Sequence, residues 1–155
     1  MSMTLKNQYL LLLLISTISL AFAYIVEYIM HLAACPLCIY QRFPYLIYIM
    51  LSIIALSSKE NYDRYFALTA FSACILAGYH TGIERGVFEL SAFCTPLVSV
   101  TDNISVEDFT KMLYNQQIGT CNKPALVIFS LSMTEWNLLL NLALLAMFIK
   151  PKKMD

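Results

Sequence analysis

The stretch Tyr9–Met30, YLLLLLISTISLAFAYIVEYIM, contains one charged side chain, Glu27, near its far end. A hydrocarbon core about 30 Å thick needs roughly 20 apolar residues in a helix. Three further stretches are apolar at nearly this length: Ile39–Leu56, Tyr65–Ile83 and Met133–Ile149. Since a backbone cannot cross lipid with unpaired polar groups, we expect all four to be helices. The predicted fold class is therefore all-α, a single integral membrane domain built as a four-helix bundle.

The composition as a whole is that of a membrane protein. Of the 155 residues, 59% are hydrophobic and 13% are charged, whereas a soluble domain usually carries about 25% charged residues. The mean hydropathy is +0.67. The formal net charge is zero, and no basic block typical of nucleic-acid-binding proteins is present in the sequence. We therefore expect a lipid bilayer as a partner and no nucleic acid.

The distribution of lysine and arginine predicts the orientation in the membrane. Six of the ten lie before the first helix, between the second and third, or after the fourth: Lys6, Lys59, Arg64, Lys150, Lys152 and Lys153. Short loops rich in these residues face the cytoplasm. We therefore expect a multi-pass protein with both termini in the cytoplasm and with outer loops over 31–38 and 84–132. Four of the five cysteines then lie outside, where disulfides persist.

The first helix also has features of a cleaved signal peptide. Lys6 precedes the apolar run, and Ala21-Phe22-Ala23 resembles a cleavage site. The run continues unbroken to Met30, however, which is long for the apolar part of a signal peptide. We therefore expect residues 1–23 to be retained.

The loop over 84–132 contains two stretches with structure of their own. Ser105 and Asp108 form a capping-box pattern, and the apolar residues that follow predict a short amphipathic helix over Val106–Gln116 at the membrane surface. The second stretch, Ala125–Leu131, is apolar but too short to span, and we expect it at the membrane interface. Packing on the bundle and docking of a partner are both open as roles for the two stretches.

Two closely spaced cysteines occur in the sequence CPLC over Cys35–Cys38. Thiol–disulfide exchange requires a thiolate, which is favoured by a helix N-terminus and by a nearby cation. Pro36 suits the first turn of a helix, so Cys38 is expected near the N-terminus of the second helix. Arg42 lies one helical turn later on the same face, where its charge would stabilise a Cys38 thiolate. Pro44 is expected to kink this helix.

Each of these features also has a purely structural interpretation. A bond between Cys94 and Cys121 would close a loop of about 28 residues and stabilise the fold by roughly 3–4 kcal/mol. A zinc site usually combines two closely spaced ligand pairs, so the wide separation of Cys94 and Cys121 counts against zinc, and no metal is expected. Arg42 is also suited to anchoring the helix at the interface, and His80 to a hydrogen-bonding role within the bundle.

Two further side chains lie inside apolar runs. Glu27 needs a polar partner in such surroundings, and His31, one helical turn later, is placed to provide it. Cys74 lies in the middle of the third predicted helix and is expected to behave as a small apolar residue.

Three motifs resemble those of one family. The octapeptide CPLCIYQR over Cys35–Arg42 resembles the CxLCxxxR signature of the disulfide bond formation protein B (DsbB) family. The segments YHTGIE over Tyr79–Glu84 and SLSMTEWN over Ser130–Asn137 are similar to segments of many of its members. With four predicted helices and a second cysteine pair in the second outer loop, the resemblance covers most of the chain.

The resemblance implies an enzyme of the bacterial inner membrane that generates disulfides. Members of this family reoxidise a periplasmic DsbA-like protein of the thioredoxin fold and pass the electrons to the membrane quinone pool, either ubiquinone or menaquinone. DsbA-type disulfides are strong oxidants, at about −120 mV, so an ordinary thiol pair needs a further electron acceptor to regenerate them. The sequence carries no flavin or nucleotide fingerprint, which favours a membrane quinone as that acceptor.

The motif match also implies residue roles. The implied catalytic residues are Cys35, Cys38, Cys94 and Cys121. The reduced partner would attack Cys94, whose disulfide mate is Cys121, and the electrons would then move to the CxxC pair. Cys38 would be the thiolate that engages the quinone. Arg42 would hold the carbonyl end of the quinone, and His80 is a further candidate for the quinone pocket.

Three other hypotheses remain. A relative of vitamin K epoxide reductase would also be an enzyme, but that family usually places its loop cysteines before the CxxC, the reverse of the order here. A membrane scaffold with static disulfides, or a zinc-clamped assembly factor, would not be an enzyme. Loss of folding without loss of redox turnover in Cys38→Ser would favour the scaffold, and stoichiometric bound metal would favour the assembly factor.

Overall fold

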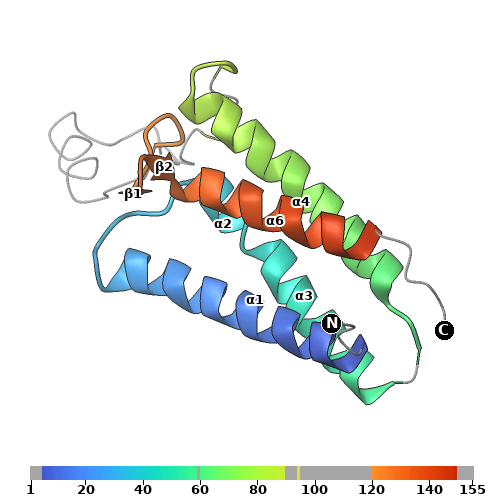
Figure 1. The fold of residues 1–155 in the computed structure, drawn as a ribbon. Coiled ribbons are helices and arrows are strands. Elements are labelled where there is room, and N and C mark those ends of the chain that lie inside the picture. Colours follow the sequence, from blue (N-terminus) through green and yellow to red (C-terminus); the bar gives the residue numbers. More distant parts are fainter. Residues whose placement is uncertain (1–4, 59, 90–93, 95–119, 150–155) are drawn as a thin grey trace, which may run out of the picture.

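The computed structural model describes residues 5–58, 60–89, 94 and 120–149. The helices are α1 (Leu5–Tyr28), α2 (Pro36–Tyr40), α3 (Phe43–Ser57), α4 (Asp63–Glu84) and α6 (Met133–Ile149), and the strands are β1 (Val127–Ile128) and β2 (Leu131–Ser132) (Figure 1). The prediction of a helical membrane bundle is confirmed, with a small antiparallel hairpin added to it. The expected surface helix Val106–Gln116 lies outside the described residues.

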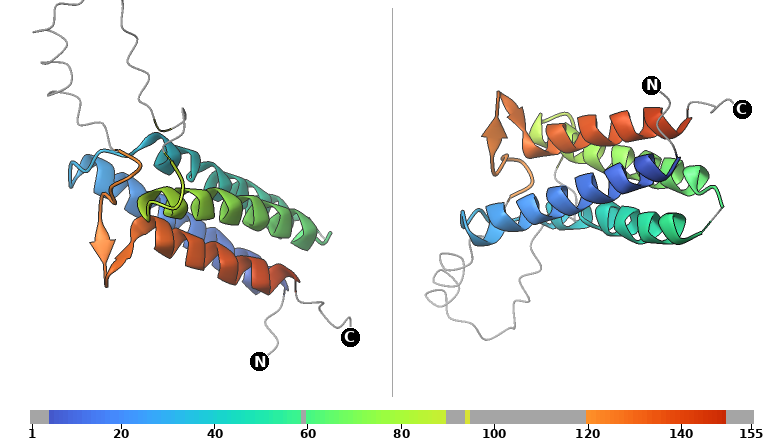
Figure 2. Two further views of the ribbon diagram at one scale, coloured as in Figure 1. Left: turned by 90° about the horizontal axis from the view of Figure 1, so that it is seen from above. Right: turned by 60° about the horizontal axis from the view of Figure 1, so that its bottom comes forward.

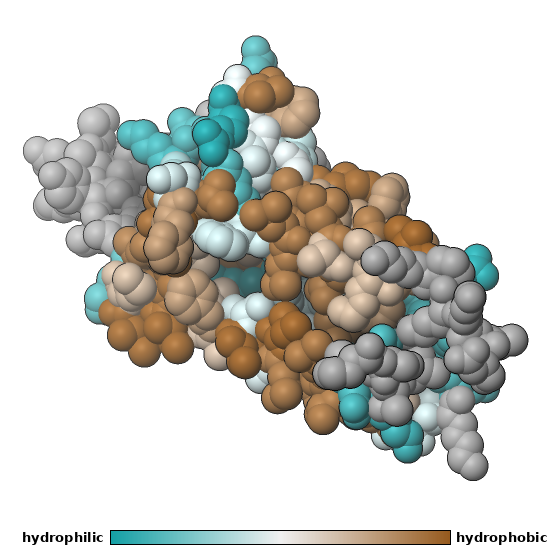
Figure 3. Space-filling model, viewed as in Figure 1, coloured by the Kyte–Doolittle hydropathy of each residue, from teal (hydrophilic) through white to brown (hydrophobic). Residues whose placement is uncertain are grey.

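The outer faces of the helices are apolar. Three described stretches are long and apolar enough to cross a membrane: Lys6–Tyr28, Pro36–Ser57 and Asp63–Glu84. The fourth long helix, α6, is apolar but shorter. Large side chains such as Ile18, Met50 and Leu68 point outward, and Figure 3 shows apolar residues over much of this face. Such a continuous apolar surface is unfavourable in water and suited to hydrocarbon, so the chain is a membrane protein.

The four long helices that the structure describes pack as two pairs, and the members of each pair are consecutive long helices in the chain. α1 lies beside α3, α4 lies beside α6, and α3 joins the two pairs through α4 (Figures 1 and 2). The start of α1 and the end of α6 lie at the same end of the bundle as the turn between α3 and α4 (Figure 2). The short helix α2, the hairpin and the end of α4 lie at the opposite end, which is called here the cysteine end.

The second predicted helix, 39–56, is divided in the structure. α2 ends at Tyr40, Gln41 and Arg42 form a turn, and α3 begins at Phe43. Pro44 has no N–H to bond the carbonyl of Tyr40, and its ring would clash there, so the helix breaks just before it. The expected kink is therefore a two-residue turn in which Gln41 and Arg42 keep right-handed helical dihedrals, and it directs these two polar residues toward the interior of the bundle. Of the other helices, α1 begins and ends before the predicted 9–30, α4 slightly exceeds 65–83, and α6 has the expected bounds.

The core away from the cysteine end is built from stacked aromatic rings. Phe66 is fully buried, and its ring centroid lies 5.4 Å from that of Tyr9 and 5.0 Å from that of Phe148. These three residues join α1, α4 and α6. In the middle of α4 the buried residues are alanines, whose small side chains permit a neighbouring helix to approach closely: Ala70, Ala73 and Ala77.

The end of α4 is fixed by two glycines. Gly86 adopts φ +71°, and the bonds from Gly86 N to Ile83 O (3.0 Å) and from Val87 N to Gly82 O (2.8 Å) form a Schellman motif. A Cβ on Gly82 would lie 2.3 Å from the Phe88 ring. The YHTGIE motif therefore ends in a turn that lays Phe88 back over α4, where it stacks on Tyr79 at 5.6 Å.

The apolar stretch Ala125–Leu131 forms most of a β-hairpin whose loop has two residues. Phe129 and Ser130, at its tip, both have positive φ (52° and 66°), as in the tight turns that match the twist of paired strands. Trp136 donates from Nε1 to the carbonyl of Ile128 (3.0 Å), so the hairpin is tied to the first turn of α6. The expectation that this stretch lies at the membrane interface is not tested by these contacts.

Candidate active site

Four cysteines gather in one cluster at the cysteine end. Cys35, Cys94 and Cys121 are buried, and Cys38 packs against them. The Sγ atoms of Cys35 and Cys38 are 3.0 Å apart, and the Cys35 thiol donates toward Cys38. The Sγ atom of Cys121 lies within 4.8 Å of Cys35 Sγ. Two pairs that are far apart in the sequence therefore meet in space.

The CxxC segment is organised by the start of α2. Cys35 is the N-cap residue, and its Sγ accepts a hydrogen bond from the backbone N–H of Cys38 (3.3 Å). Pro36 occupies the first helical turn, where its missing N–H costs nothing. Cys38 thus lies near the N-terminus of a helix, as predicted.

The thiols of Cys35 and Cys121 hold their protons firmly. The hydrogen bond to Cys38, followed by burial, raises the pKa of Cys35 to about 12. Burial, followed by a hydrogen bond with Cys94, raises the pKa of Cys121. Both groups therefore need help to form a thiolate, since the thiolate is the reactive form in exchange.

His80 supplies a polar neighbour to Cys35. Its Nε2 lies 3.5 Å from Cys35 Sγ, and its side chain is 1% exposed. Its other nitrogen, Nδ1, lies 2.9 Å from Nε2 of Gln41. The sequence suggested a place in a quinone pocket, but in this structure His80 lies against the sulfur cluster.

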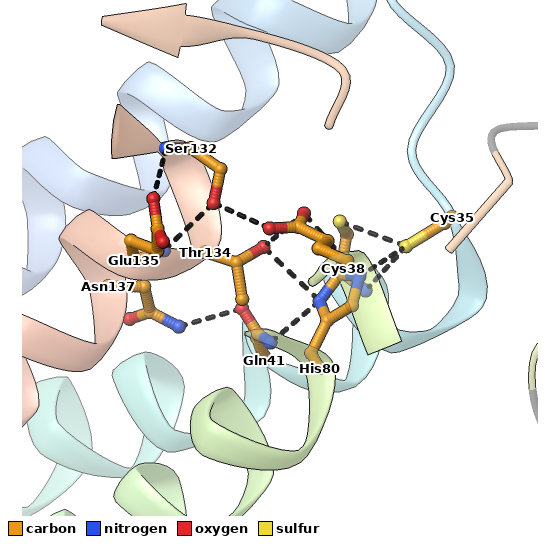
Figure 4. Close-up of polar contacts among 9 residues, drawn as sticks. Cys35, Cys38, Gln41, His80, Ser132, Thr134, Glu135 and Asn137 are labelled. Carbon is orange, nitrogen blue, oxygen red and sulfur yellow. Dashed lines mark hydrogen bonds and ion pairs between the residues drawn. The ribbon is translucent and has the colours of Figure 1, made fainter. Parts of the chain in front are cut away.

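A chain of amides leads to Nδ1 of His80, and Figure 4 draws its links from Asn137 through Gln41 to the ring. Asn141 Nδ2 donates to Asn137 Oδ1 (2.8 Å), and Asn137 Nδ2 donates to Gln41 Oε1 (2.8 Å). Because Gln41 Oε1 is the acceptor of that bond, the group of Gln41 that faces His80 is the Nε2 amide, which can only donate. His80 Nδ1 therefore accepts a hydrogen bond from Gln41 Nε2. The proton of the neutral ring is then on Nε2, facing Cys35. Gln41, Asn137 and Asn141 were not predicted as site residues, although Gln41 lies inside the octapeptide.

A carboxylate closes the other side of this network. Glu84 accepts from the Ser132 hydroxyl (2.5 Å) and from the Thr134 hydroxyl (2.9 Å). Its Oε1 lies 3.9 Å from His80 Nε2. Glu135 accepts from the Ser132 backbone N–H (2.8 Å) and pairs with Arg85. The polar residues of the SLSMTEWN segment therefore hold the end of α4 and the start of α6 together around His80.

Arg42 has a different partner from the one expected. Its Nη2 lies 2.5 Å from Oε2 of Glu27 on α1, and its guanidinium carbon lies 4.8 Å from the centroid of the Tyr24 ring. Gln41 and Arg42 keep right-handed helical dihedrals between α2 and α3, so the one-turn spacing from Cys38 does not by itself decide the partner of Arg42. The prediction that His31 serves as the partner of Glu27 is wrong, because the chain leaves α1 after Tyr28 and His31 adopts φ +53°.

A cleft opens beside the cysteine cluster, between α1 and α6. Its volume is about 500 Å³, and the hollow is visible in Figure 3 between apolar rims. The main polar lining comes from α1, the α2–α3 junction, the end of α4 and the start of α6: Ser19, Glu27, Cys38, Gln41, Arg42, Glu84, Thr134 and Asn137. Most of the remaining lining is apolar, for example Leu20, Val26, Met133 and Leu140. An apolar cleft with a few convergent polar groups suits a lipid-soluble ligand with polar oxygens, so the residues present fit a quinone head group.

The cluster also has the donors for a soft metal ion. The donor atoms of Cys35, His80 and Cys121 lie within 4.8 Å of one another, and thiolate and imidazole are ligands that zinc prefers. The wide spacing of the cysteines in the sequence, which counted against zinc, therefore does not keep possible zinc ligands apart in the structure. In the network described above, however, His80 Nε2 carries a proton, so a metal there would require the proton to move to Nδ1.

Comparisons with known proteins agree with the motifs. The family model described as Disulfide bond formation protein DsbB matches residues 6–150. A protein of Rickettsia prowazekii (strain Madrid E), named Uncharacterized protein RP370, is 44% identical over 140 residues, or 88% of this chain and 81% of that protein. Disulfide bond formation protein B of Cupriavidus metallidurans (strain CH34) is 25% identical over 137 residues, or 86% of this chain and 84% of that protein. No solved structure gives a significant match.

Proposed function

Since the chain belongs to the disulfide bond formation protein DsbB family, we propose that it is a protein-thiol:quinone oxidoreductase of the bacterial inner membrane. It reoxidises a periplasmic DsbA-like protein of the thioredoxin fold and delivers the electrons to ubiquinone or menaquinone. Both termini lie in the cytoplasm, and the cysteine end of the bundle faces the periplasm.

One observation carries the proposal: Cys38 belongs to the sulfur cluster and also lines the cleft. Its Sγ is 3.0 Å from that of Cys35, and it forms part of the cleft wall with Gln41 and Arg42. The sulfurs therefore form a series from Cys94 and Cys121, through Cys35, to Cys38 at a lipid-facing cleft. A static disulfide scaffold would not need its last sulfur in such a cleft.

The proposed reaction begins with exchange at the outer pair. A thiolate of the reduced partner attacks Cys94 Sγ, the Cys94–Cys121 bond breaks, and Cys121 leaves as a thiolate. The second thiol of the partner then resolves the mixed disulfide. The partner becomes a disulfide, and Cys94 and Cys121 together gain two electrons and two protons.

Exchange between the two pairs follows from the proximity of Cys121 to Cys35. The Cys121 thiolate attacks Cys35 Sγ of the Cys35–Cys38 disulfide, and Cys38 leaves as a thiolate at the cleft. Cys94 then attacks Cys121, which restores the outer disulfide and releases Cys35. Because the pKa of Cys35 is raised to about 12, the departing sulfur takes up a proton, and the Nε2–H of His80 supports its charge until then.

The last step needs an acceptor of two electrons and two protons, and a quinone bound in the cleft would provide one as it becomes a quinol. The chain contributes the positions of the donors. Cys38 presents its sulfur to the cleft as a thiolate, and Cys35, on re-forming the disulfide, gives up the proton that it holds. The second proton is one of the two that Cys121 and Cys94 release when they attack as thiolates, and it reaches the cleft through solvent. The cationic guanidinium of Arg42 and the amide of Gln41 offer hydrogen bonds to carbonyl oxygens.

Quinone reduction by the purified full-length protein tests this proposal. With a reduced DsbA-like dithiol as donor and a short-chain ubiquinone or menaquinone as acceptor, we expect catalytic quinol formation that is abolished in Cys38→Ser. Folding of Cys38→Ser should be unchanged, as judged by its melting temperature in detergent. Turnover that persists in this variant, or no turnover by the wild type with either quinone, would contradict the proposal.

A zinc-clamped assembly factor is the second candidate, favoured by the Cys35, His80 and Cys121 donor set. It predicts one tightly bound zinc per chain after purification and thiols that become alkylatable only after chelation. The oxidoreductase predicts full turnover in metal-free protein.

A further inference from the structure

The ion pair between Glu27 and Arg42 is placed in the wall of the cleft. Glu27 lies on α1, near the end of a run with no other charge, and Arg42 lies in the turn between α2 and α3. Both side chains line the cleft and are largely buried, at 23% and 14% exposure. A charged side chain buried in a membrane protein is costly unless it is paired. The Glu27–Arg42 pair therefore serves either to position these two side chains or to stabilise the fold.

The ion pair with Glu27 leaves a hydrogen-bond donor of the Arg42 guanidinium without a partner among the described residues. Glu27 holds Nη2, and the Tyr24 ring covers one face. The Nε atom of Arg42 is buried and has no hydrogen-bond partner among the described residues. Most buried donors in proteins have an acceptor, so this N–H is a donor that a bound ligand could satisfy.

We propose that Glu27 is a positioning residue for the quinone: it holds Arg42 against α1, so that the free edge of the guanidinium donates to a carbonyl oxygen of the head group. The inference rests on the proposed function and extends it to a residue outside the family motifs quoted above. Glu27 does not itself need to touch the quinone. Its carboxylate balances the charge of Arg42 and restricts the rotation of a long side chain, which would otherwise lose conformational freedom on binding.

The alternative is that the pair only joins α1 to the α2–α3 turn. Such a role would lower the melting temperature when Glu27 is changed, and it would not couple Glu27 to Arg42 in ligand binding. The two roles therefore differ in a binding measurement, and the chain provides its own reporter. Trp136 is the one tryptophan of the sequence, and it lines the same cleft, so a quinone bound there is expected to quench its fluorescence.

The experiment titrates a short-chain ubiquinone into full-length Cys38→Ser protein in detergent, in which no turnover intervenes. We expect saturable quenching of Trp136 in this background. Glu27→Gln, which keeps the shape and loses the charge, should raise the dissociation constant about tenfold. Glu27→Asp should restore part of the affinity. Glu60→Gln, a control at an exposed acid in the turn between α3 and α4, should have no effect.

Coupling to Arg42 is tested by a double-mutant cycle. Arg42→Lys keeps the charge but lacks the Nε–H and the planar fork, and it should also weaken binding. Addition of Glu27→Gln to Arg42→Lys should then have little further effect, because the group that Glu27 positions is already lost. Additive losses, or affinity that is unchanged in Glu27→Gln, would overturn the inference while leaving the proposed function intact.

Two further outcomes complete the test. If Glu27→Gln folds poorly, Glu27→Asp and Arg42→Lys still give the cycle, and affinities that are independent of one another would overturn the inference. If the background protein shows no saturable quenching and the wild type reduces no quinone, the proposed function fails and the inference fails with it. A lower melting temperature in Glu27→Gln with unchanged affinity would assign the pair to folding alone.

Discussion

At the end of the bundle where α1 begins and α6 ends, three stacked rings join the helices, together with the hydrogen bond from Tyr9 to Asp63, whereas at the cysteine end a network of hydrogen bonds joins them. Tyr9, Phe66 and Phe148 meet at centroid distances of 5.0–5.4 Å. At the other end, Gln41 and His80 are buried together with the amides and hydroxyls of α6. Ring packing is tolerant of small shifts, but a hydrogen-bond network fixes orientation. The comparison suggests that one end mainly stabilises the fold and the other mainly orients reactive groups.

Removal of the central ring should give the largest loss of stability. Phe66→Ala leaves a cavity between three helices and is expected to lower the free energy of unfolding by about 3–5 kcal/mol. Leu68→Ala, on the lipid-facing side of the same helix, is the matched control and should cost much less. Thermal unfolding in detergent measures both. If Phe66→Ala instead changes turnover without changing stability, the division between the two ends is wrong.

A glycine at the cysteine end should show that this end is also tightly packed. Gly82→Ala places a Cβ 2.3 Å from the Phe88 ring, and we expect a loss of about 1–3 kcal/mol. Gly78→Ala, one turn earlier in α4, meets nothing within 4 Å and should be neutral or stabilising by up to about 1 kcal/mol. In a Phe88→Ala background the cost of Gly82→Ala should disappear. If the cost persists there, the ring is not its cause.

The reactivity of Cys35 should report the hydrogen bonds at this end. The bond to Cys38 is the main cause of its raised pKa, which is about 12, so Cys38→Ala should lower that pKa and increase the thiolate fraction at a given pH. Below the pKa, alkylation should accelerate about tenfold per pH unit. Alkylation of Cys35, followed by peptide mass spectrometry between pH 7 and 11, should therefore be faster in Cys38→Ala. Equal rates at every pH would show that burial alone controls this thiol.

The fifth cysteine should give the smallest effect. Cys74 lies in α4 between the two ends and outside the sulfur cluster. We expect Cys74→Ala to change stability by less than about 1 kcal/mol and to leave turnover unchanged. A large loss of turnover in this variant would mean that the relay extends beyond the cysteine end.

Much of the fold was predictable because it depends on local properties of the chain. Runs of apolar residues predicted the long helices, and the bounds of α6 agree with the expected Met133–Ile149. Pro36 and Pro44 marked the start of the second helix and the turn between α2 and α3. The hairpin was missed because Phe129 and Ser130 carry its positive φ angles, and neither is a residue that usually signals such a turn.

The site was less predictable because its contacts are long-range. Arg42 pairs with Glu27 across a loop, and His80 meets Gln41 and Cys35 from a different helix. The spacing of one helical turn predicted that Arg42 would lie beside Cys38 and that His31 would be the partner of Glu27. Such spacing predicts neighbours only within one helix. His31 lies beyond the end of α1, and Arg42 lies in the turn between α2 and α3, so the packing of separate helices decides their partners.

The amide chain behind His80 has a consequence for proton movement. Gln41 and Asn137 are neutral amides, which neither gain nor lose protons near neutral pH, so this branch of contacts does not conduct protons. The other polar neighbour of Nδ1 is the Thr134 hydroxyl, at 3.3 Å, which donates to Glu84. Proton movement at the imidazole is therefore confined to the groups that adjoin Glu84, namely this hydroxyl and the Nε2 atom, which lies 3.9 Å from the carboxylate.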